Sequence, residues 1–215
     1  MSEQARPRRP EAVSPMLDAL RAGTREHHLD LERDLDLPGR IRSRTDLSSV
    51  LSAMLAGWQP LERRLAAVDW AGLRLDPRLG EATDLLRADL RALNGEPHDG
   101  EAGPERTDAP GFDRLARAVG GRYALLGSAL GGRVIAPVVE RRLDLPEGAA
   151  TRFFRRSGMA PGRDWRDFRA ALAARDWSPT ELDQAVAAAR ETFVFVGRAA
   201  APILGRRPAA PHRVA

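Results

Sequence analysis

The chain of 215 residues contains no cysteine and no lysine. Without cysteine it cannot form a disulfide bond, offer a thiolate to a metal, or hold an iron–sulfur cluster through sulfur. Without lysine, its 34 basic residues are all arginine, and they nearly balance 30 acidic residues to leave a net charge of +4. We attribute this use of arginine to nucleotide composition and do not expect the protein to bind nucleic acid.

The sequence also lacks long hydrophobic runs and strand-like patterns. No apolar stretch approaches the ~18 residues that a membrane span needs. The basic residues 1–10 lack the apolar segment of a signal peptide. No segment alternates between apolar and polar residues with enrichment in β-branched types, as a half-buried strand would. These absences predict an all-α, cytoplasmic protein with no membrane span.

We predict a single helical domain over residues 14–205, between a disordered tail at 1–13 and a loose tail at 206–215. Two helix starts are marked by serine followed by proline, at Ser14-Pro15 and at Ser178-Pro179. An exposed loop is expected at 94–110. Apolar periodicity predicts helices over residues 15–35, 46–68 with a kink at Pro60, 80–93, 111–142, 146–154, 163–175, and 179–197 or beyond.

The most unusual stretch is an apolar helical run that contains Gly127, Gly131 and Gly132. Each glycine inside a helix costs roughly 1 kcal/mol relative to alanine, so the bare backbone must serve a purpose. Gly127 and Gly131 are four residues apart and share one face of the helix. That face either packs closely against another helix or lies against a flat ligand, and the glycines alone leave both interpretations open.

Two of the four histidines, His27 and His28, lie in the first predicted helix. At about 100° per residue they fall on opposite sides of its apolar stripe, so periodicity does not choose between them. Glu32 lies one turn beyond His28 on the same face and can accept the second ring N–H of a metal-bound histidine. An ordinary boundary histidine is the alternative interpretation.

The chain shows no pair or cluster of ligands with the spacing of a conventional metal site. A single axial histidine is sufficient only when a macrocycle such as haem supplies the other donors. Haem would also need a second helix that approaches its other face and leaves room for a small gas. The glycine-rich helix meets that requirement.

These residues resemble the haem oxygenases, and more closely the bacterial haem oxygenases that accompany phytochromes. The resemblance spans about residues 14–200. Its first and third stretches are the more specific. The stretches are LRAGTREHHLDLE at 20–32, WQPLERRL at 58–65, YALLGSALGGRVI at 123–135, TRFFRRSGMAPGRDWRDFRAAL at 151–172, and ARETF at 189–193.

The resemblance implies a helical bundle with haem between a proximal helix and a kinked distal helix. It implies that His28 binds the iron, with Thr24 four residues before it. It implies that Gly127 and Gly131, with Gly132 beside them, lie against the haem face. The remaining haem-binding residues that it implies are Arg21, Arg25 and Arg169 at the propionate edge, together with Glu32 and Phe193.

The implied reaction opens haem to biliverdin and releases iron and carbon monoxide. It consumes O2 and electrons from an external donor such as a ferredoxin or a flavoprotein reductase, because the chain has no nucleotide or flavin motif. A bacteriophytochrome is the implied recipient of biliverdin. Ser128 stands where many family members carry an aspartate that orders water at bound oxygen, and the tyrosine expected near Ser157, after the pair Phe153-Phe154, is absent. Two alternatives stay open: a haem carrier of the same fold without turnover, and a helical interaction protein without haem.

Overall fold

The computed structural model describes residues 14–76, 81–94, 108–159 and 161–205. The predicted tails at 1–13 and 206–215, and most of the loop predicted at 94–110, lie outside these residues. The described part contains helices and no strand, as predicted. None of its helices is both long and apolar enough to span a membrane.

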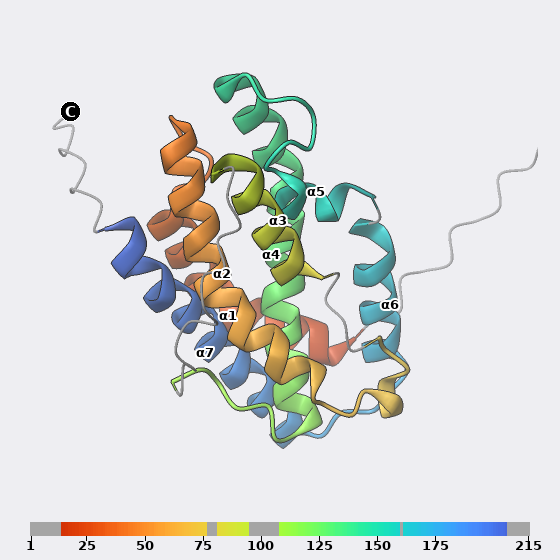
Figure 1. Cartoon of the computed structure of the whole chain (residues 1–215). Coiled ribbons are helices and arrows are strands. Elements are labelled where there is room, and N and C mark those ends of the chain that lie inside the picture. Colours follow the sequence, from red (N-terminus) through yellow and green to blue (C-terminus); the bar gives the residue numbers. More distant parts are fainter. Residues whose placement is uncertain (1–13, 77–80, 95–107, 160, 206–215) are drawn as a thin grey trace, which may run out of the picture.

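Seven α-helices and one short 3-10 helix make up the described part of the chain (Figure 1). Most lie within a few residues of their predicted bounds. The 3-10 helix, η1, was not predicted. In chain order they are α1 (Pro15–Leu35), α2 (Arg44–Ala66), η1 (Ala71–Leu73), α3 (Ala82–Asn94), α4 (Leu115–Leu143), α5 (Arg152–Met159), α6 (Pro161–Ala173) and α7 (Pro179–Leu204).

Both predicted serine–proline helix starts are confirmed. The Ser14 hydroxyl accepts a hydrogen bond from the backbone N–H of Leu17, and Pro15 is the first residue of α1. Ser178 and Glu181 form a reciprocal capping box at the start of α7. These local signals set where two long helices begin, and therefore the register in which their side chains face the core.

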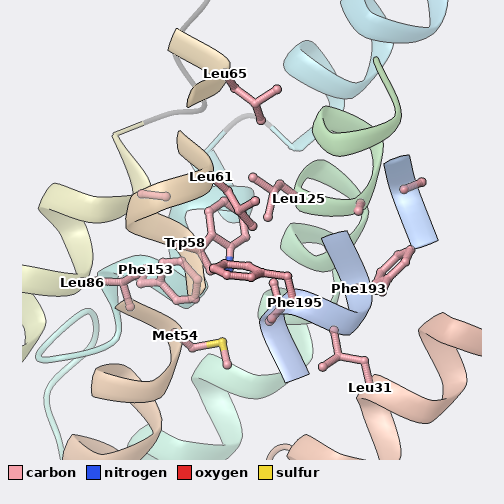
Figure 2. Close-up of a cluster of buried hydrophobic side chains, with 14 of the residues drawn as sticks. Leu31, Met54, Trp58, Leu61, Leu65, Leu86, Leu125, Phe153, Phe193 and Phe195 are labelled. Atoms are coloured by element: carbon pink, nitrogen blue, oxygen red, sulfur yellow. The ribbon is translucent and has the colours of Figure 1, made fainter. Parts of the chain in front are cut away.

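The last helix, α7, packs against α1, α2 and α4 and so joins the bundle together (Figure 1). Gly120 permits the close crossing of α4 and α7, since a Cβ atom there would collide with the backbone oxygen of Ala185. Trp58 lies in the buried cluster beside Leu61 and Phe153 (Figure 2). The rings of Trp58 and Phe153 meet edge to face, with centroids 5.4 Å apart.

The helix predicted over residues 146–154 was placed too early in the chain. Residues 147–151 form turns, and α5 begins at Arg152. The buried carboxylate of Asp89 on α3 accepts hydrogen bonds from the backbone N–H groups of Arg152 and Phe153, at 3.1 and 2.8 Å. Burial raises the pKa of Asp89 above its usual value. This helix start therefore depends on a residue about 60 positions earlier, which no local pattern reveals.

The turn before α5 is held by Glu140 near the end of α4. Its carboxylate accepts hydrogen bonds from Arg155, from the Thr151 hydroxyl and from the Gly148 backbone N–H. These bonds, led by that of Arg155, lower the pKa of Glu140 to about 2. Because the folded-state pKa lies below the unfolded value, the cluster stabilises the protein above about pH 4.5 and loses that contribution as the pH falls towards 2.

We expect Glu140→Gln to lower the free energy of unfolding at pH 7 by about 3 kcal/mol, the value of the pKa shift at roughly 1.4 kcal/mol per unit. The difference in the free energy of unfolding between wild type and variant should narrow as the pH falls from 5 to 2. Urea titrations at each pH would measure it. Glu147→Gln is the matched control. Glu147 also pairs with Arg155, but its side chain is 81% exposed, so its loss should cost little. A gap that stays constant with pH would contradict this account.

Candidate functional site

A cavity of about 880 Å³ opens between α1 and α4. Its walls come from α1, α2, α4, α5, α6 and α7, and most of the lining side chains are apolar. The predicted site residues that line it are Arg21, Arg25, His28, Glu32, Gly127, Gly131, Gly132 and Phe193. Its size and character suit a large, flat and mainly apolar ligand.

From α1, His28 is the histidine that lines the cavity, whereas its neighbour His27 is not part of the wall. Thr24, one turn earlier, is buried in the same wall, and its hydroxyl donates a hydrogen bond of 2.7 Å to the Leu20 carbonyl oxygen. The ring of His28 meets that of Phe193 on α7 edge to face, with centroids 5.6 Å apart. The packing of α1 on α7 therefore fixes the imidazole beside the cavity.

The carboxylate of Glu32 lies 3.7 Å from Nδ1 of His28. This distance is slightly longer than a hydrogen bond. The two side chains lie close together because residues four apart share one face of a helix. Since Nδ1 faces the glutamate, Nε2 is the nitrogen left to meet a ligand in the cavity. This matches the way in which a ligating histidine is oriented through its other ring nitrogen.

On α4, the glycines divide between the two interpretations that the sequence left open. A Cβ atom at Gly127 or Gly131 would have no neighbouring atom within 4 Å, so both face open space. A Cβ atom at Gly132 would collide with the backbone of Phe154 on α5. Gly132 thus permits helix packing, while Gly127 and Gly131 leave the cavity wall bare.

Two of the three predicted arginines lie at the cavity. Arg21 and Arg25 are exposed residues of α1 that line it. Arg169 is half-buried on α6 and is not among the lining residues, whereas Trp165 of the same helix is. The backbone of Ser128 continues α4, and its side chain and that of Ser157 lie outside the described residues.

The prediction missed several residues of the inner wall. Trp58 on α2 and Tyr123 on α4 line the cavity, and so does Arg156 on α5. Arg156 lies three residues after Phe153, so both occupy one face of a short helix. That spacing was visible in the sequence, but the burial of the face was not, because α5 was predicted too early.

The comparisons with known proteins agree with this geometry. The family model described as "Heme oxygenase" matches residues 14–200. The chain belongs to the haem oxygenase family. Among solved structures, the heme oxygenase from Leptospira interrogans superposes with a TM-score of 0.65 at 17% sequence identity, over 87% of this chain and 98% of that one. No curated protein matches the chain.

Membership in the haem oxygenase family confirms the predicted family and the all-α fold class. At 17% identity, the structural likeness shows only that the two proteins share a fold. The residues that hold haem must therefore be argued from this chain's own cavity. Two independent features of the cavity fit haem. One is a histidine on α1 with one ring nitrogen available, and the other is a wall of glycines without side chains on α4.

Proposed function

We propose that this protein is a haem oxygenase of the phytochrome-associated bacterial type, which converts haem to biliverdin with release of iron and carbon monoxide. The single observation that carries the proposal is that His28 and the open glycines Gly127 and Gly131 line one cavity. Few other ligands need both an axial imidazole and a wall without side chains.

In this proposal His28 is the iron ligand, through Nε2. Glu32 orients the ring from the Nδ1 side, and Phe193 holds it by an edge-to-face contact. Arg21 and Arg25 bind the propionates, because a guanidinium pairs with a carboxylate through two parallel hydrogen bonds. When bound, haem supplies the iron centre at which oxygen is activated.

The distal wall is the proposed catalytic element. Gly127 and Gly131 would leave space for oxygen beside α4, and they add no side chain that would compete for it. Ser128 offers a hydroxyl, which can both donate and accept a hydrogen bond but carries no fixed charge. We propose that this hydroxyl helps to hold the water through which protons arrive, in place of the aspartate found in many relatives.

Electrons come from an external protein such as a ferredoxin or flavoprotein reductase. Arg21 and Arg25 are exposed beside the cavity, so an acidic donor would be attracted to the edge at which the ring is held. A bacteriophytochrome that receives biliverdin is part of the same proposal.

The test is aerobic turnover of the hemin-loaded protein with a ferredoxin and its reductase. We expect the Soret band to disappear, free iron to reach a chelator, and biliverdin to be recovered by extraction and mass spectrometry. A Soret band that persists under oxygen and electrons would instead support a haem carrier of the same fold. Absence of any Soret band would support a protein that does not bind haem.

The predicted propionate-binding residues Arg25 and Arg169 allow a paired comparison. Arg25→Glu should weaken hemin binding by up to about tenfold, since it places a negative charge beside the propionates at an exposed edge. Arg169→Glu should have a smaller effect, because Arg169 does not line the cavity. Fluorescence quenching titrations with hemin would measure both. A larger loss of hemin affinity in the Arg169 variant would indicate that Arg169, and not Arg25, binds a propionate.

A further inference from the structure

Arg190 on α7 makes a contact with α1 that the proposed reaction does not use. Its Nε atom donates a hydrogen bond of 2.6 Å to the backbone carbonyl oxygen of Gly23. In an α-helix that carbonyl also accepts the backbone N–H of the residue four positions later, here His27. Arg190 is exposed and is not among the residues that line the cavity, so any effect that it has on the cavity must pass through α1. The bond joins α7 to the turn of α1 that leads into His28.

The backbone of α1 is bare at the point where Arg190 binds it. A Cβ atom at Gly23 would collide with the side chain of Val186, which lies one turn before Arg190 on α7. Gly23 therefore lets α7 come close, but it offers no side chain that could interlock with that helix. A hydrogen bond from an arginine is directional and is strengthened by the charge of the donor. Such a bond fixes the position of α1 along α7, which packing at a glycine does not.

The imidazole of His28 depends on α7 for its orientation. Its side chain is 39% exposed, so the surrounding wall encloses it only in part. Glu32, beside Nδ1, is 61% exposed and can follow the ring if the ring turns. Phe193, by contrast, is buried on α7, three residues after Arg190, and meets the imidazole edge to face. The firmer support of the ring therefore comes from α7, and its orientation depends on how the two helices are aligned.

We propose that Arg190 is a positioning residue for His28. Through the Gly23 carbonyl it fixes the turn of α1 before the histidine, while Phe193, one turn further along α7, meets the imidazole itself. Together they keep Nε2 of His28 directed into the cavity. The orientation of the ring does not depend on haem, whereas its use as an iron ligand rests on the proposed function.

Two variants separate the hydrogen bond from the charge and length of the side chain. Glutamine carries its amide nitrogen, and methionine its terminal carbon, at the same position along the side chain as Nε of arginine. Arg190→Gln therefore keeps a donor for Gly23 without the charge, whereas Arg190→Met keeps the length and loses the donor. Arg198→Met is the matched control, because Arg198 is an exposed arginine further along α7. Since Arg190 is exposed, each variant should lose no more than a few degrees in Tm.

The first arm uses the haem-free protein and the NMR signals of its histidine rings. His28→Ala identifies which signals belong to His28. In Arg190→Met these signals should shift, because the imidazole moves relative to the aromatic ring of Phe193. In Arg190→Gln and Arg198→Met they should keep their wild-type positions. Equal shifts in Arg190→Gln and Arg190→Met would assign the effect to the charge and overturn the proposal.

The second arm uses the hemin-loaded proteins. Resonance Raman spectra of the ferrous state report the iron–histidine stretch. This stretch should move to lower frequency and broaden in Arg190→Met, because a ring that is no longer fixed binds iron in a range of less favourable orientations. It should be unchanged in Arg190→Gln. Recovery by glutamine but not by methionine is a result that a general loss of helix packing would not give.

Histidine signals of Arg190→Met that match those of the wild type would overturn the proposal, and so would an unchanged stretch in a protein that ligates haem. Arg190 would then be only a link between two helices. The haem-free arm also separates this proposal from the proposed function. If the wild type shows no iron–histidine stretch but the His28 signals depend on Arg190, the oxygenase proposal is contradicted and the positioning role stands.

Discussion

Replacing Gly132 by alanine is expected to lower the free energy of unfolding by about 3 kcal/mol, whereas the same change at Gly131 should leave it equal or raise it. At Gly132 the new methyl group would overlap the backbone of Phe154. The backbone of α5 cannot move aside as a flexible side chain would, so the cost lies at the upper end of what overpacking produces. The two helices would separate, and the inner wall of the cavity with them.

At Gly131 the methyl group meets no atom within 4 Å. Alanine is the better helix former by up to about 1 kcal/mol, so the haem-free protein should melt at the same or a higher temperature. The methyl group would nevertheless project into the space proposed for oxygen and its ordered water. Biliverdin formation should therefore slow several-fold while stability holds.

The measurement is thermal melting of the haem-free protein beside single-turnover absorbance spectra, for Gly131→Ala and Gly132→Ala in parallel. Stability and activity should move in opposite directions for Gly131→Ala and together for Gly132→Ala. A large loss of stability with normal turnover in Gly131→Ala would remove this glycine from the distal wall. Gly131 would then serve close helix packing, which is the alternative that the sequence left open.

The second large effect is expected at His28. His28→Ala should abolish the spectrum of histidine-ligated haem, because the axial nitrogen is gone from the cavity wall. His27→Ala should keep that spectrum, since His27 does not line the cavity. Imidazole added to the His28 variant should restore ligation, because the remaining wall is intact.

Optical and resonance Raman spectra of the ferrous proteins would report the iron–histidine bond directly. Glu32→Gln is a milder variant that tests the same bond. It removes the charge 3.7 Å from Nδ1 of His28 but keeps a hydrogen-bond acceptor, so ligation should persist with a shifted iron–histidine stretch. Loss of the ligand in the His27 variant, with retention in the His28 variant, would reverse the assignment.

Local signals predicted the helices well where the responsible residues are close in sequence. Ser14 with Pro15, and Ser178 with Glu181, carry their capping partners within three residues, and both helix starts were placed correctly. The start of α5 was misplaced because Asp89 caps it from another helix. Apolar periodicity predicts that a helix exists, but a cap supplied by a distant carboxylate decides where it begins.

The candidate site was predictable to a similar degree and for similar reasons. The spacing of Thr24, His28 and Glu32 along one helix face is a local property, and these residues do line the cavity together. The sequence could not separate Gly131 from Gly132, because only the position of α5 decides which one faces another backbone. Arg156 was missed for the same reason, since its place in the cavity wall depends on the contact between Trp58 of α2 and Phe153 of α5.

The central claim is that the cavity between α1 and α4 binds one haem, and a hemin titration tests it most directly. Difference absorbance at the Soret maximum, measured as hemin is added to the full chain, should rise and saturate at one equivalent. In the proposed function, Arg21 and Arg25 affect only how tightly that equivalent is held. A Soret change that never saturates, or none at all, would contradict the claim and leave the glycines of α4 without a haem to face.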